Sequence, residues 1–112
     1  MQKNIPLTEE QKLSLTYRVE PGCLGPDGAI HIADFCKYTQ ERIQTLDADY
    51  LIWNIVPRHD KALPEMQYSV VGKRINHVQA EKYLAAFGKS LDEFEGHLVD
   101  KLAELIDQFM KQ

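Results

Sequence analysis

One thiol of this chain stands where a protein can make it reactive. Cys23 belongs to the stretch EPGCLGPDG, residues 20–28, which runs directly into a helical pattern. The positive end of a helix dipole lowers the pKa of a nearby thiol and favours the nucleophilic thiolate. A dithiol pair would need a cysteine where Pro26 stands, and a thiol phosphatase loop would need an arginine where Ala29 stands. We therefore expect Cys23 to be a buried side chain in a tight bend; its use as a nucleophile stays an alternative.

The same bend is a poor place for an anion or a metal ion. Its sequence GCLGPDG matches neither glycine pattern of the nucleotide-binding loops, and Glu20 and Asp27 would repel a phosphate. His31 and Cys36 could join Cys23 around zinc, but they project about 140° apart on an ideal helix. We expect no metal site and no cofactor.

The most site-like cluster is PRHDK, residues 57–61. A histidine beside a carboxylate, here His59 beside Asp60, can perform general acid–base catalysis. Arg58 and Lys61 supply two cations that can bind an acidic ligand. The plainer interpretation, which we favour, is a polar loop kept in water by its charges.

These residues must be positioned by strands and helices, which the hydrophobic periodicity predicts. Strict alternation over residues 13–19 indicates a strand with one buried face. The run YLIWNIVP is apolar on both faces, as in a central strand covered on both sides. The elements expected in chain order are a strand at 13–19, a helix at 29–46, strands at 50–57 and 66–71, a short strand through Ile75 after a turn at Gly72, and helices at 76–88 and 91–111.

This order predicts an α+β fold, with a small mixed sheet of three to four strands in the order β-α-β-β-(β)-α-α. We expect one domain, in which a polar lead-in at 1–12 precedes a βαββ(β)α unit at 13–88 and an amphipathic helix at 89–112. The first two strands should run parallel through a right-handed crossover, and the second and third should form a hairpin. Parallel strands would bring the bend at Cys23 and the loop at His59 to one edge of the sheet.

The segment LPEMQYSVVGKRI resembles the proline–strand–glycine turn–strand portion of thioredoxin-like folds, and the β-α-β beginning is similar. The resemblance is one of architecture. The dithiol of that family is absent, and the stretch between the second strand and Pro64 leaves no room for its second crossover helix.

Composition and charge narrow the classes of partner. The chain has 112 residues, a net charge of −4 and no long basic run, which disfavours nucleic acid and anionic membranes. Two cysteines are too few for a secreted disulfide framework, and neither a signal peptide nor a long apolar segment begins the sequence. We expect a soluble, cytoplasmic protein.

The last helix carries a leucine-rich stripe close to a heptad seam, interrupted by Glu95. Together with the doubly apolar second strand, it favours a homodimer. The leading hypothesis is therefore a small binding or interaction domain without catalysis, associating with itself or with another protein. The alternative is a small enzyme or acidic-ligand-binding protein that uses Cys23 and the loop Arg58-His59-Asp60.

Overall fold

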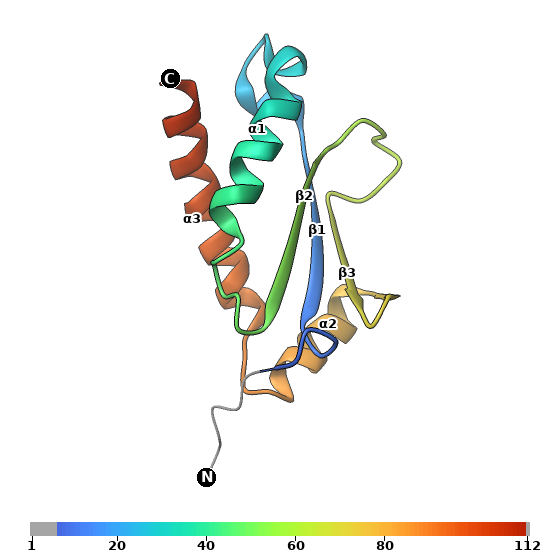
Figure 1. The fold of residues 1–112 in the computed structure, drawn as a ribbon. Helices are drawn as coiled ribbons and strands as arrows, with labels where there is room; N and C mark the ends of the chain where they lie inside the picture. Colours follow the sequence, from blue (N-terminus) through green and yellow to red (C-terminus); the bar gives the residue numbers. More distant parts are fainter. Residues whose placement is uncertain (1–6, 112) are drawn as a thin grey trace.

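The computed structural model describes residues 7–111 and contains the predicted series of strands and helices (Figure 1). The polar lead-in predicted at 1–12 is thus described only from Leu7 onward. In chain order the elements are β1 (Leu13–Val19), a 3-10 turn η1 (Pro21–Leu24), α1 (Gly28–Ile43), β2 (Leu51–Pro57), β3 (Met66–Val70), β4 (Lys73–Ile75), α2 (His77–Ala85) and α3 (Leu91–Met110).

The strands form one mixed sheet in the order β2-β1-β3-β4. β1 and β2 are parallel, with Leu13 opposite Leu51, so the α+β class and the predicted parallel pairing are confirmed. The predicted hairpin between the second and third strands is wrong, because β3 pairs antiparallel with β1, on its other edge. The chain between β2 and β3 is long enough to cross the end of β1, where the Arg18 side chain and backbone N–H bind the carbonyls of Pro64 and Glu65.

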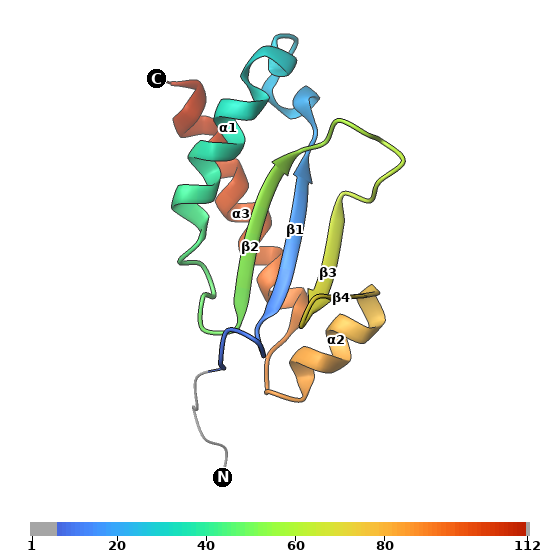
Figure 2. The ribbon, with the colours of Figure 1, turned by 45° about the vertical axis from the view of Figure 1, so that its right-hand side comes forward.

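One face of the sheet is buried by the helices. Register places Leu15, Trp53 and Tyr68 on that face, and all three are at most 5% exposed. Figures 1 and 2 show α1 and α3 on the same side of the strands. β2 lies at one edge of the sheet, so the prediction that it is a central strand is wrong. On the face away from Trp53, Ile52 and Val56 are only partly buried, so within residues 7–111 β2 is not fully covered on both faces as predicted.

The glycine-rich stretch is a tight bend fixed by close packing. A Cβ added to Gly28 at the start of α1 would lie 1.7 Å from the Pro21 carbonyl oxygen, so only glycine fits there. Gly25 has a φ of 95°, a conformation that side-chain-bearing residues rarely adopt. η1 therefore lies against the first turn of α1, with Leu24 as its buried side chain.

The two edge strands of the sheet, β2 and β4, are protected against further pairing. Along the outer edge of β2, Gln40 of α1 donates to the Trp53 carbonyl at 3.0 Å and accepts from the Ile55 N–H at 2.8 Å. A side-chain amide thus takes the place of a neighbouring strand. β4 is three residues long and carries Lys73 and Arg74, a short charged edge that disfavours association of sheets.

The last two helices begin where the sequence predicts. Asn76 and Gln79 form a complete capping box before α2, and the Ser90 hydroxyl accepts from the Glu93 N–H before α3. The apolar stripe of α3 packs within the chain, where Phe109 meets Phe35 of α1 edge-to-face. No helix within residues 7–111 is long and apolar enough to cross a membrane.

Candidate functional site

The two polar stretches singled out by the sequence meet at one rim of the sheet, as the parallel strands require. The Arg58 N–H donates to the Val19 carbonyl at 2.9 Å, which joins the ends of β1 and β2. The Arg58 guanidinium pairs with the Glu20 carboxylate at 2.8 Å. We call residues 20–24 together with 58–63 the rim.

The rim's charged groups are used to hold its own loop. Besides Glu20, the Arg58 guanidinium binds the carbonyls of Lys61 and Leu63, both at 3.2 Å. The Asp60 carboxylate accepts from the Ala62 N–H at 2.9 Å, which shapes the turn of the loop. Two of the predicted ligand-binding or catalytic groups therefore have structural partners and do not face an open site.

The other two loop candidates, His59 and Lys61, are exposed to solvent. The contacts described for residues 7–111 include no side-chain partner for either. A histidine without a carboxylate or hydroxyl partner lacks the orientation that a general base requires. His59 and Asp60 are neighbours in the sequence, but no contact described for residues 7–111 joins their side chains as a dyad.

Cys23 is exposed, so the prediction that it is buried is wrong; the short turn η1 presents it at the surface instead. Desolvation nevertheless raises the pKa of the Cys23 thiol above its ordinary value, and the charges of Glu20 and Glu65 raise that pKa further. The thiol is therefore poorly activated, which the helix-dipole argument did not anticipate. α1 begins only at Gly28, five residues further along the chain.

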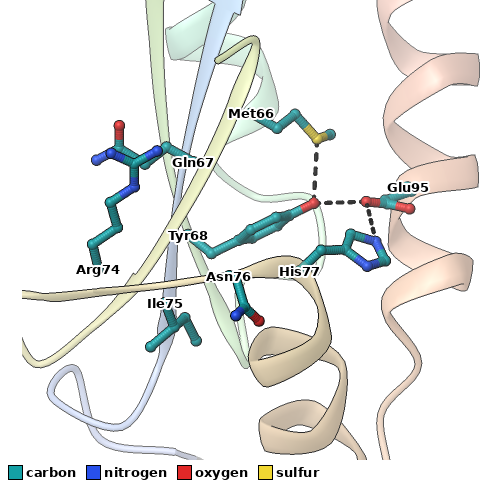
Figure 3. Close-up of a pocket in the computed structure, with 8 residues that line it drawn as sticks. All are labelled: Met66, Gln67, Tyr68, Arg74, Ile75, Asn76, His77 and Glu95. Atoms are coloured by element: carbon teal, nitrogen blue, oxygen red, sulfur yellow. Dashed lines mark hydrogen bonds and ion pairs between the residues drawn. The ribbon is translucent and has the colours of Figure 1, made fainter. Parts of the chain in front are cut away.

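A pocket of about 540 Å³ lies away from the rim, where β3 and β4 meet the first turn of α2 and the second turn of α3 (Figure 3). It is lined by Met66, Gln67, Tyr68, Arg74, Ile75, Asn76, His77 and Glu95. Its size is in the range of small-ligand sites. Its lining mixes apolar side chains with convergent polar groups, as binding sites do.

Three polar side chains converge on its inner wall. The Tyr68 hydroxyl donates to Glu95 Oε2 at 2.7 Å, and His77 Nε2 lies 3.4 Å from the same oxygen. Figure 3 shows the Tyr68 and His77 rings directed toward this carboxylate. Burial raises the pKa of Tyr68, and the hydrogen bond to Glu95 with its charge adds to the rise, so Tyr68 is a donor.

This arrangement is suited to binding a hydrogen-bond donor. Glu95 Oε2 accepts from Tyr68 and lies beside His77, whereas no contact described for residues 7–111 uses Oε1. The Glu95 side chain is 28% exposed, so a ligand can reach it. No serine, threonine or cysteine is among the residues that line the pocket, so the common hydroxyl and thiol nucleophiles are missing from this lining.

The sequence analysis did not select these residues. His77 was a plain helix-opening residue, Tyr68 one of several strand aromatics, and Glu95 an interruption of an apolar stripe. That interruption was the available signal, because an acid on a core-facing stripe requires a partner. Its partner, Tyr68, is 27 residues away in sequence and could not be named without the fold.

Comparison of the chain with family models, with curated proteins and with solved structures found no match. The architectural resemblance to thioredoxin-like folds therefore has no support from these comparisons. Function has to be argued from the site itself.

Proposed function

We propose that this protein is a small binding domain, without catalysis of its own, that holds its partner in the pocket between β3, β4, α2 and α3. The observation that carries the proposal is the Glu95 carboxylate on the pocket wall, fixed by Tyr68 at 2.7 Å and still partly exposed. A carboxylate oriented in this way is ready to accept a donor without rearrangement.

The alternative, an enzyme or acidic-ligand site at the rim, has less support. Arg58 is engaged with Glu20 and two carbonyls, and Asp60 with the backbone of its own loop. The raised pKa of Cys23 argues against a thiolate at neutral pH. The described contacts of Arg58 and Asp60 serve the turn that these residues build.

Association with a second copy remains part of the proposal, and one observation favours a particular surface. The sheet face opposite α1 and α3 carries the partly exposed apolar side chains Ile52 and Val56 of β2. A second copy could cover them. We propose a cytoplasmic location because Cys23 and Cys36 are both free thiols.

Backbone amide spectra of the isotope-labelled protein test the site. A library of small amines, carboxylic acids and short peptides is added, and the shifted amides are mapped. We expect the shifts to concentrate at Tyr68, Ile75 and His77. Shifts concentrated at Cys23 and residues 58–61 would favour the rim instead, and a library that moves no pocket amide would contradict the proposal.

Two controls complete this experiment. His59→Ala, at the rim, should leave ligand-induced shifts unchanged, whereas Glu95→Gln should reduce those caused by amines. Sedimentation of the same sample tests self-association, with Ile52→Glu expected to dissociate a dimer formed through the open sheet face.

A further inference from the structure

The pocket reaches around the edge of a strand. Because side chains alternate along a strand, Met66 and Tyr68 project toward the helices, whereas Gln67 projects to the opposite face. Arg74 of β4 pairs with Ser69 of β3, so its side chain lies on the same face as that of Gln67. Figure 3 shows Gln67 and Arg74 on one side of β3 and Tyr68 on the other. Since residues of both faces line one pocket, an occupant must pass along the strand edge between them.

The register leaves that edge without a strand partner at one residue. The Glu65 carbonyl accepts a hydrogen bond from the Arg18 N–H of β1. Gln67, two residues further along β3 and opposite Thr16, directs its backbone groups to the same side, toward β1. The backbone groups of an antiparallel strand alternate between its two sides, so those of Met66 point away from β1. If β4 continued in the same register, residue 77 would lie opposite Met66. The pairing ends at Ile75, opposite Tyr68, because α2 begins at His77. Met66 therefore presents an N–H and a carbonyl at the pocket.

The charge beside this edge selects the kind of side chain that can enter. Glu95 is the one carboxylate among the residues lining the pocket, and Oε1 has no partner among the contacts described for residues 7–111. The lining's cation, Arg74, belongs to the far face of the sheet. Met66, whose sulfur lies 3.4 Å from the Tyr68 hydroxyl that binds Glu95, supplies apolar surface in the pocket, which suits the aliphatic stem of a long basic side chain.

Building on the proposed function, we propose that the pocket binds an extended peptide segment of a partner protein. The segment lies beside β3 where β4 has ended, and it pairs with the backbone N–H and carbonyl of Met66. It directs a lysine or arginine side chain to Glu95. Main-chain pairing supplies affinity in this mode of recognition, and the side-chain pocket supplies specificity. The charged pair with Glu95 should contribute about tenfold or more to affinity.

Selection from a phage-displayed library of random twelve-residue peptides tests this proposal with the full chain. We expect the enriched peptides to share a lysine or arginine. A synthetic peptide from the selection should shift the amide of Met66, and replacing its basic residue with norleucine should weaken binding about tenfold. Enriched peptides that lack a basic residue would overturn the proposal.

Protein variants separate the charge from the edge. Glu95→Gln should weaken the peptide about tenfold, while Asp100→Asn, an exposed acid on the same helix outside the pocket, should leave affinity unchanged. Met66→Pro removes the outward N–H at a strand's first residue, where proline is tolerated, and should weaken binding well beyond Met66→Ala. Trp53 fluorescence reports whether each variant is folded. Equal affinity of the two Met66 variants would overturn the strand-pairing part.

The outcomes also separate this inference from the proposed function. If no peptide is enriched but small amines shift the pocket amides, the peptide proposal is wrong and the binding function stands. If neither peptides nor small molecules move Tyr68 or His77, both are wrong. If the protein forms a concentration-dependent dimer and Met66→Pro abolishes it, the occupant is a second copy of the chain. That result would overturn the proposal that the occupant is a different protein.

Discussion

The rim and the pocket differ in how their polar groups are used. At the rim, the Arg58 guanidinium meets Glu20 at 2.8 Å and two carbonyls of its own loop. In the pocket, the Glu95 carboxylate meets Tyr68 and His77 through one oxygen and keeps part of its surface exposed. At the rim, the described contacts of Arg58 are made with Glu20 and with its own loop, whereas in the pocket one oxygen of Glu95 has no described contact.

This difference shows why residue type and proximity in sequence did not point to the pocket. The stretch PRHDK groups four polar side chains, yet a tight loop needs such groups for its own turns. The pocket draws Tyr68, His77 and Glu95 from a strand and two helices. Each of the three has an ordinary explanation alone, and only the fold joins them.

The largest expected effect on stability comes from Gly28, which packs against the start of η1 next to the rim. Gly28→Ala should destabilise the protein by about 3 kcal/mol or more, because the new Cβ would lie 1.7 Å from the Pro21 carbonyl oxygen. The displaced η1 should also disturb Cys23 and the ends of β1 and β2. Urea unfolding followed by Trp53 fluorescence measures the change.

The matched control is Gly22→Ala in the same bend. A Cβ there meets nothing within 4 Å, and the residue has no positive φ, so its stability should stay within about 0.5 kcal/mol of the parent. Equal stability of the two alanine variants would show that η1 does not pack against α1 as described.

Arg58→Ala should have the next largest effect. It removes the pair with Glu20 and the bonds to the carbonyls of Lys61 and Leu63, a loss of about 2 kcal/mol in unfolding free energy. Lys61→Ala, an exposed neighbour, should change stability by less than about 0.5 kcal/mol. If Arg58→Ala folds with unchanged stability but loses ligand binding, the rim is the functional site and the comparison reverses.

Much of the fold could be predicted because periodicity reports which side of an element is buried. Alternation at residues 13–19 and the capping box at Asn76 and Gln79 are local signals, and both are found in the structure. The pairing of β3 with β1 could not be predicted in this way, since β3 could have joined either β1 or β2. That choice depends on Arg18, whose contacts with Pro64 and Glu65 exist only after the loop has crossed.

In the pocket, polar contacts should matter more for binding than for stability. Tyr68→Phe and Glu95→Leu should each destabilise by about 1 to 2 kcal/mol, because each leaves its partner without a strong hydrogen bond. The double variant should be more stable than the sum of the single effects predicts, by about 1 kcal/mol, since both polar groups leave together. A thermal or urea double-mutant cycle gives this coupling.

The same double variant should weaken ligand binding about tenfold or more, because it removes the Glu95 charge. Retention of binding would mean that the Glu95 carboxylate is structural, like Arg58 at the rim. Strictly additive stability effects would contradict the hydrogen bond between Tyr68 and Glu95.

A smaller gain in stability is expected at the hairpin between β3 and β4, far from the ligand edge. Val71 and Gly72 both have positive φ, 52° and 76°, a turn that favours Asn-Gly. Val71→Asn should therefore raise the unfolding free energy by about 1 kcal/mol while leaving ligand affinity unchanged. Val99→Asn, at an exposed position of α3, is the control and should gain nothing. Lower stability of Val71→Asn would contradict the strained turn.

The smallest expected effect is a pH dependence of stability, which distinguishes the pair of His77 and Glu95 from the pair of His97 and Asp47. Outside the pocket, His97 Nδ1 lies 2.9 Å from Asp47 Oδ2, and this hydrogen bond, together with the Asp47 charge, raises the pKa of His97 above 6.5. A raised pKa in the folded state means that the folded protein binds the proton more tightly than the unfolded chain. The stabilisation is therefore complete below about pH 6.5 and is lost as pH rises through the folded-state pKa.

His97→Gln should accordingly flatten the fall in urea midpoint between about pH 6 and about pH 8, whereas His31→Gln, an exposed histidine of α1, should keep it. Because His97 is exposed, the fall should be slight and should shrink further at high salt. A parent midpoint that rises over this interval would contradict the pair between His97 and Asp47. A fall that persists in His97→Gln but vanishes in His77→Gln would instead assign the pH dependence to the pocket, where a bound ligand would alter it.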